Sequence, residues 1–161
     1  INCCGHENFP DGEIFTSPVE DGVNGHITFS YPSIMNGNEF EEVRLVVKNG
    51  RIEEVSCKNE EKLSTLLSYI DTDEGSRFFG EVAIGTNYGI KRHTKNILFD
   101  EKIGGSIHMA IGEAFKEAGG KNESAIHWDM INDMTDGGKI YADGELFYEN
   151  GRFKEELVQK K

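Results

Sequence analysis

The feature that most constrains the fold is a set of turns in which Asn or Asp precedes Gly. Asn49-Gly50, Asp143-Gly144 and Asn150-Gly151 each separate two short stretches of strand-forming residues. Such pairs favour the two-residue turns that join antiparallel strands. The chain holds 19 Gly among 161 residues but only 3 Pro, so many tight turns are expected. The turns therefore predict that most strands pair antiparallel.

The spacing of apolar residues predicts the individual elements. Strands are expected at residues 13–16, 26–31, 40–47, 51–57, 78–84, 125–130, 139–142 and 145–148, with a last one from Arg152 onward. Residues 63–70 carry one apolar stripe, which predicts a helix with Asn59 as its N-cap. A second helix is predicted at residues 106–115, before Gly119-Gly120.

No linker, repeat or low-complexity stretch divides the sequence, so we predict a single domain over residues 1–161. The predicted fold class is α+β, with a mixed, mostly antiparallel β-sheet of roughly eight short strands and two helices. No apolar run approaches the roughly 18 residues of a membrane helix, which argues against a membrane span.

Charge and cysteine content limit the expected partners and location of the protein. There are 29 acidic and 17 basic residues, for a net charge of −12. Such a surface repels phosphate backbones, so we expect no nucleic-acid partner, whereas cations and free amines are compatible with it. Cys3, Cys4 and Cys57 form no disulfide framework, which favours a reducing, cytoplasmic location. The chain begins at Ile1 without a signal peptide, which indicates a processed chain or a piece of a longer protein.

One pair of residues with metal-ligating chemistry stands out locally. His127 and Asp129 lie two apart in a predicted strand, so both side chains point to one face. An imidazole and a carboxylate on one face can share a metal ion. The alternative is a core histidine paired with a nearby carboxylate.

Three more candidates stand alone in the sequence. His108 lies in an apolar, Gly-flanked segment, where it is either a ligand or a core residue. Glu81 lies inside an otherwise apolar strand, and a buried carboxylate is costly unless it is paired or metal-bound; alternatively it faces solvent from an edge strand. Glu13, taken alone, has the features of an ordinary acidic residue in a loop. No nucleotide-binding loop, nucleophile elbow or H-E-x-x-H motif is present, and carboxylates and imidazoles suit divalent metals.

Longer stretches resemble the C-terminal portion of the M29 family of metallo-aminopeptidases, the thermophilic aminopeptidases. The resemblance runs in order through about half of the chain, whereas residues 35–77 are generic. The similar stretches are Asn8 to Asp21 with Val23-Asn24-Gly25, Gly80 to Asn87, Asn96 to His108, Lys121 to Met130, and the turn Asp143-Gly144-Glu145-Leu146.

The resemblance implies a two-metal site and an activity. Its ligands are expected to be Glu13, Glu81, His108, His127 and Asp129. Glu81, as the carboxylate shared by both ions, is assigned the catalytic role. The expected cofactors are two divalent ions, of zinc, cobalt, manganese or magnesium. The implied function is hydrolysis of N-terminal residues from peptides that have a free N-terminus.

The sequence also departs from the family pattern. Family members carry a larger N-terminal domain, absent here, and are typically homodimers, so a missing domain and a second copy are expected partners. The family usually has a Tyr seven residues after the metal-binding His, where this chain has Phe115. The isolated chain is therefore expected to be poorly active. The alternatives are a non-catalytic metal-binding or dimerisation module derived from the family, and an interaction domain without metal.

Overall fold

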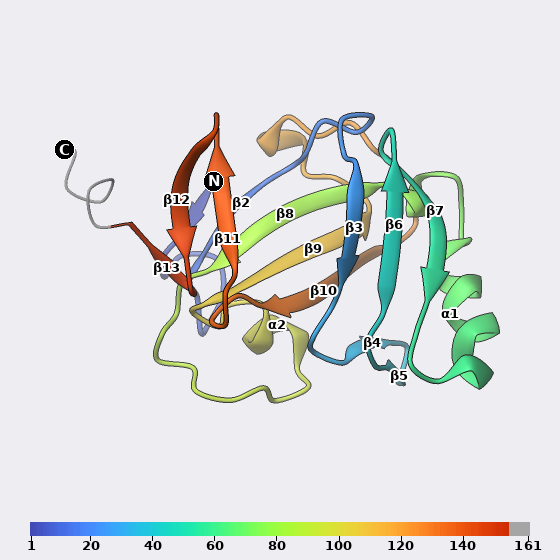
Figure 1. The fold of residues 1–161 in the computed structure, drawn as a ribbon, viewed down its shortest axis with the longest axis horizontal. Helices are drawn as coiled ribbons and strands as arrows, with labels where there is room; N and C mark the ends of the chain where they lie inside the picture. Colours follow the sequence, from blue (N-terminus) through green and yellow to red (C-terminus); the bar gives the residue numbers. More distant parts are fainter. Residues whose placement is uncertain (155–161) are drawn as a thin grey trace.

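A computed structural model describes residues 1–154 of the chain. Its centre is a five-stranded sheet in the order β1-β2-β8-β9-β10, in which every neighbouring pair is antiparallel (Figure 1). The strands of this sheet are β1 (Asn2–Cys3), β2 (Glu13–Thr16), β8 (Phe79–Gly85), β9 (Ser106–Gly112) and β10 (His127–Asp133). The α+β class with mostly antiparallel strands is thus confirmed.

Three smaller sheets surround the central one. They are β3-β6-β7, with β3 (Gly25–Thr28), β6 (Arg44–Lys48) and β7 (Arg51–Ser56); the hairpin of β4 (Ser33–Met35) and β5 (Asn38–Phe40); and β11-β12-β13, with β11 (Lys139–Ala142), β12 (Glu145–Glu149) and β13 (Arg152–Phe153). The described residues thus form 13 strands, more than the roughly eight expected, because β1, β4 and β5 are only two or three residues long and β9 replaces an expected helix. The part of the last expected strand beyond residue 154 lies outside the described residues.

The turns that join the hairpins are the ones that the Asn-Gly and Asp-Gly pairs predict. Asn49, Asp143 and Asn150 have φ of 49°, 51° and 50°, and each is followed by a Gly that also has a positive φ. Left-handed conformations at both central residues match the twist of antiparallel strands. At Gly50 a Cβ would lie 1.7 Å from the Glu20 carbonyl oxygen, so this turn also needs Gly for space.

The helices are short. α1 (Leu63–Ile70) follows a 3₁₀ turn, Glu60–Lys62, and Asn59 caps that turn by accepting a 3.0 Å hydrogen bond from the amide of Glu61. α2 (Ile97–Asp100) lies in the long connection between β8 and β9. Two further 3₁₀ turns are Gly75–Arg77 and Lys116–Ala118. No helix among residues 1–154 is long and apolar enough to cross a membrane.

The helix predicted at residues 106–115 is wrong, because Ser106–Gly112 forms the strand β9. β9 pairs with β8 on one side and β10 on the other, so it is an interior strand. Both faces of such a strand are covered, so it can hold an unbroken apolar run such as Met109-Ala110-Ile111, which resembles a buried helix. Gly119, with φ of 83°, instead ends the 3₁₀ turn at Lys116–Ala118.

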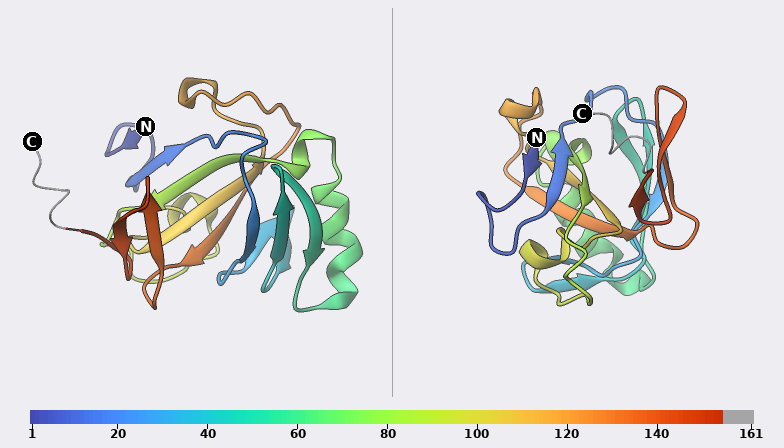
Figure 2. Two further views of the ribbon diagram at one scale, coloured as in Figure 1. Left: turned by 45° about the horizontal axis from the view of Figure 1, so that its top comes forward. Right: turned by 90° about the vertical axis from the view of Figure 1, so that its left-hand side faces the viewer.

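The hydrophobic core lies between one face of the central sheet, the β3-β6-β7 sheet and α1. Figure 2 shows α1 at the end of the molecule opposite the β11-β12-β13 sheet. The buried core residues are Phe29, Phe40, Val43, Leu45, Val47, Ile52, Leu66, Ile70, Phe79, Ile111, Trp128 and Met130. Trp128 and Met130 alternate along β10 with His127 and Asp129, so the site candidates occupy the opposite face of the sheet.

Candidate metal centre

All five predicted ligands lie on this opposite face of the central sheet. Glu81 on β8, Ala110 on β9 and Asp129 on β10 are aligned in one row across three strands. His108 lies two residues from Ala110 and therefore shares its face. Ala110 is small and fully buried, so it leaves space between the two carboxylates.

A β-bulge at Gly80 turns Glu81 toward the site. Phe79 pairs with Ile111, whereas Glu81 pairs with Ala110, so two positions on β8 oppose one position on β9. The extra residue lets Phe79 enter the core while Glu81 points to the opposite face, which is how a bulge re-aims a side chain. A Cβ at position 80 would lie 2.3 Å from the Glu113 carbonyl oxygen, so only Gly fits here.

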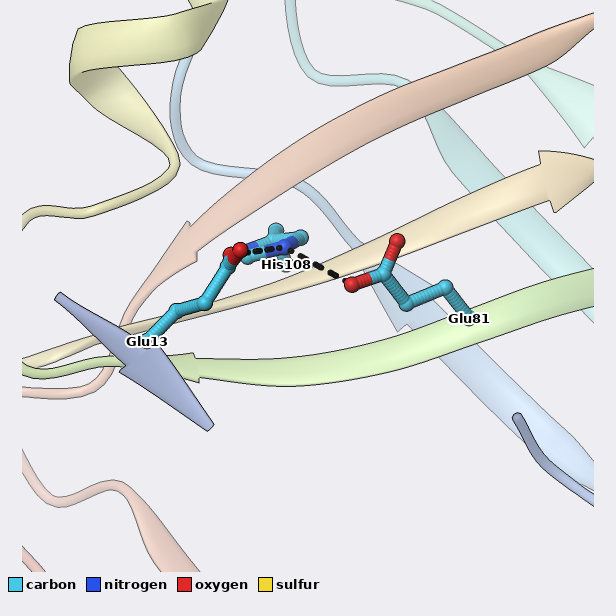
Figure 3. Close-up of side chains that lie close together, drawn as sticks. All are labelled: Glu13, Glu81 and His108. Carbon is cyan, nitrogen blue, oxygen red and sulfur yellow. Dashed lines mark ion pairs between the residues drawn. The ribbon is translucent and has the colours of Figure 1, made fainter. Parts of the chain in front are cut away.

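The side chains converge on each other in space. The His108 Nε2 lies 3.3 Å from Glu13 Oε2 and 3.5 Å from Glu81 Oε1 (Figure 3). The His127 Nε2 lies 3.1 Å from Glu81 Oε2 and 3.6 Å from Asp129 Oδ1. The two oxygens of Glu81 therefore face two different histidines.

These contacts define two groups of ligand atoms that share Glu81. Glu13, Glu81 and His108 form one group, and Glu81, His127 and Asp129 form the other; within each group the ligand atoms lie within 4.8 Å of one another. Glu13, Glu81 and His108 are thus brought to the His127–Asp129 pair, across up to 116 residues of sequence.

Burial and missing hydrogen bonds indicate that the site suits a cation. Glu13, Glu81 and His108 are buried, with 6%, 4% and 1% of their surface exposed. Glu13 Oε2 and Asp129 Oδ1 are buried and make no hydrogen bond. A buried carboxylate oxygen without a partner is costly, and a divalent ion removes that cost. The donor set of carboxylates and imidazoles fits zinc, cobalt or manganese.

The carboxylates also set the protonation of the histidines. Burial alone would lower the pKa of His108, but the nearby carboxylates of Glu13 and Glu81 outweigh this effect and raise the pKa to about 10. Burial likewise opposes the charge on His127, but Asp129 and Glu81 raise its pKa to about 11. Conversely, burial alone would raise the pKa of Glu81, but its contacts with His108 and His127 outweigh burial and lower it.

A backbone contact orients His127. Its Nδ1 lies 2.7 Å from the Glu113 carbonyl oxygen, which accepts a hydrogen bond from the ring and leaves Nε2 to face the carboxylates. The Asn122 side chain holds this segment by donating to the carbonyl of Gly112 at 2.7 Å. A histidine held in this way through one nitrogen presents the other to a metal.

Glu101 and Lys102 also belong to the site, although sequence reasoning missed them. Lys102 Nζ donates to Glu13 Oε1 at 2.8 Å and also to Glu101 Oε1. Glu101, His108 and Asp129 form a third group of possible ligands. Burial and the charge of Asp129 raise the pKa of Glu101. Two adjacent opposite charges in an irregular segment resemble a solvated surface, and only the flanking apolar residues 97–99 and Ile103 hint at burial.

A cavity of about 410 Å³ opens above these groups. Phe15, Leu98 and Phe115 form its apolar side, and Glu7 and Glu117 add carboxylates. The site is thus accessible to a small organic ligand that has an apolar part and a cationic part.

Phe115 reaches this cavity by a different route from the predicted one. Without a helix at residues 106–115, the seven-residue spacing from His108 does not place the two on one helical face. Instead, the chain turns after β9 and places the Phe115 ring beside two other rings. Its centroid lies 5.1 Å from that of His127, edge to face, and 5.0 Å from that of Phe15. Position 115 therefore still borders the candidate metal ligands.

Three comparisons with known proteins point to the same family. Residues 2–153 match the model of the thermophilic metalloprotease family, M29. The aminopeptidase AmpS of Bacillus subtilis is 36% identical, over 95% of this chain and 42% of the relative. The solved structure of wild-type AmpT from Thermus thermophilus has a TM-score of 0.75 at 28% identity and covers 89% of this chain and 40% of that chain.

A more distant structure shares only the fold. The 2,5-dihydroxypyridine dioxygenase of Pseudomonas putida has a TM-score of 0.62 at 21% identity, over 88% of this chain. The chain spans about two-fifths of the length of the aminopeptidase relatives named above.

Proposed function

The chain belongs to the M29 family of thermophilic metalloproteases, and we propose that it provides the two-metal centre of an aminopeptidase. The observation that carries this proposal is the position of Glu81. Its Oε1 faces His108 and its Oε2 faces His127, so one carboxylate can serve two ions. Glu13 and Asp129 complete the two ligand groups on either side.

The residues would divide the work as follows. Glu13 and His108 would hold one ion, His127 and Asp129 would hold the other, and Glu81 would be the catalytic carboxylate shared by both. When bound, the two ions would supply an activated water and polarise a peptide carbonyl. Glu13, Glu81 and His108 are buried, which limits their contact with bulk water and strengthens their electrostatic interactions.

The proposed substrates are peptides with a free N-terminus. Carboxylates of Glu7 and Glu117 line the cavity and offer partners for a charged amine. Phe15, Leu98 and Phe115 offer apolar contacts for a side chain. We propose that a further N-terminal domain completes this cavity in the full-length protein, which acts in the cytoplasm.

The test of this function combines metal binding with an assay. Calorimetric titration of the chain with Zn²⁺ or Co²⁺ is expected to give two sites per chain. The full-length protein loaded with Co²⁺ is expected to release amino acids from peptides with a free N-terminus and to spare N-acetylated copies. Failure to cleave free peptides, with two ions bound, would refute the activity.

A second candidate function rests on Phe115. The resemblance implies a Tyr at this position, and Phe keeps the ring contact with His127 but lacks the hydroxyl. A chain that binds two ions but cleaves no peptide would be a non-catalytic metal-binding or dimerisation module. The same assay distinguishes the two functions, since only metal binding is common to both.

Metal binding is expected to strengthen with pH. The pKa of His108 is about 10 and that of His127 about 11, so between pH 6 and pH 8 each ring carries a proton that must leave before it binds an ion. One proton released for each ion makes the apparent affinity rise about tenfold per pH unit. Titrations at pH 6, 7 and 8 in buffers of different ionisation enthalpy measure this, and an affinity independent of pH would contradict it.

A further inference from the structure

Lys102 is a fully buried cation inside the candidate metal centre, and the proposed two-metal chemistry does not use it. Only 1% of its surface is exposed. Its Nζ donates to Glu13 Oε1 at 2.8 Å and to Glu101 Oε1. Burying an ammonium group is costly unless carboxylates pair with it, so these contacts hold the side chain in one place.

The backbone around Lys102 is tied to the segment that carries Glu13. Asn87, just after β8, donates its amide to the Lys102 carbonyl at 2.9 Å. The Asn87 side chain donates to the Asp11 carbonyl, also at 2.9 Å. A Cβ at Gly12 would lie 2.9 Å from the Cβ of Asn87, so the two segments approach closely only because residue 12 is Gly. The Lys102–Glu13 contact is therefore set by the fold.

This contact divides the two oxygens of Glu13. Oε1 accepts the hydrogen bond from Lys102, whereas Oε2 is buried, makes no hydrogen bond and lies 3.3 Å from His108 Nε2. An oxygen held by an ammonium group is a poor ligand for a second cation. Only Oε2 is then free to bind an ion.

We propose that Lys102 is a positioning residue that makes Glu13 a one-oxygen ligand and fixes the coordination of the ion held by Glu13 and His108. The proposal rests on the proposed two-metal function. A positioning role and a role in charge balance predict opposite effects of removing Lys102. Four carboxylates surround this centre, so removing one positive charge would on its own strengthen cation binding. If Lys102 instead positions Glu13, its removal weakens the binding of that ion.

Co²⁺ bound to the chain tests the proposal, because its visible absorption weakens as the number of ligands rises. The variants are Lys102→Met, which keeps the apolar stem, and Lys102→Ala, which leaves space for a small cation. Lys48→Met, at an exposed position on β6, is the matched control. Melting temperatures with and without Co²⁺ report whether each variant folds.

In Lys102→Met, we expect one of two Co²⁺ ions to bind about 10–100-fold more weakly, as for loss of other residues that orient ligands. Its visible absorption is expected to fall, because Glu13 becomes free to bind through both oxygens. Methylammonium chloride is expected to restore the wild-type spectrum in Lys102→Ala, whereas sodium chloride is not. A purely structural lysine would change the melting temperature and leave the spectrum unchanged.

Two results would overturn the proposal. Two ions bound by Lys102→Met with wild-type or higher affinity and an unchanged spectrum would show that Lys102 does not position Glu13. Absence of Co²⁺ binding by the wild-type chain would refute the two-metal function itself, and the role of Lys102 with it. The wild-type titration therefore separates the two failures.

Discussion

Replacing Glu81 by Gln is expected to weaken the binding of both metal ions, each by at least about 100-fold. Substituting a residue that merely orients a ligand already costs about 10–100-fold in affinity, and Glu81 is proposed to be a ligand of both ions. Its two oxygens face His108 and His127, so both ligand groups lose their shared carboxylate. Calorimetric titration with Zn²⁺ measures both sites. Peptidase activity of the full-length protein is expected to fall with them.

Three further variants show whether the effect belongs to Glu81. Of the two proposed ion-binding groups, Glu13→Gln and Asp129→Asn each remove a ligand from only one, so each is expected to weaken one ion and leave the other nearly unchanged. Glu54→Gln, at an exposed position on β7, is expected to change neither. Equal losses at both sites in Glu13→Gln, or retention of one tight site in Glu81→Gln, would argue against a shared carboxylate.

Replacing Phe115 by Tyr is expected to raise kcat of the full-length protein by about 10²–10³-fold, with little change in KM. One hydrogen-bond donor to a developing oxyanion is worth about that much in rate. The Phe115 ring borders the cavity and packs edge to face against His127, so a hydroxyl added to it would enter the site. The measurement is steady-state hydrolysis of a peptide substrate at saturating Co²⁺.

Phe147→Tyr on β12 is the matched control, since it adds the same hydroxyl outside the cavity. It is expected to leave kcat unchanged. If Phe115→Tyr also leaves kcat unchanged while the protein binds two ions, the hydroxyl is supplied by another group or is not needed. A rise in KM alone would indicate that residue 115 contacts the substrate rather than the reacting carbonyl.

Sequence reasoning succeeded where the signal is local. The Asn-Gly and Asp-Gly pairs predicted the hairpins, because their left-handed conformations suit only a few residue types. His127 and Asp129 were expected on one face of a strand, and β10 places them there. The α+β class followed from these turns and from the amphipathic helix α1.

It failed where tertiary contacts decide the structure. Residues 109–111 form an apolar run that also suits a helix, and the position of residues 106–112 between β8 and β10 makes them a strand. The bulge at Gly80 decides which face Glu81 occupies, and one isolated Gly does not reveal a bulge. No local sequence pattern indicates that Lys102 is buried, because its burial depends on pairing with Glu13, 89 residues away in the sequence.

The joint set of Glu13, Glu81, His108, His127 and Asp129 came from the family resemblance rather than from spacing. Each residue alone has an ordinary structural explanation. What the structure adds is the arrangement around Glu81, which faces both histidines at once. From this arrangement we predict that the five residues are metal ligands.

The most direct test of this arrangement is an anomalous-scattering map from crystals of the chain soaked in Zn²⁺, with data measured on both sides of the zinc absorption edge. We expect two peaks about 3.5–4 Å apart, with Glu81 between them, one beside Glu13 and His108 and the other beside His127 and Asp129. A single peak, or two peaks that do not both contact Glu81, would contradict the two-metal centre.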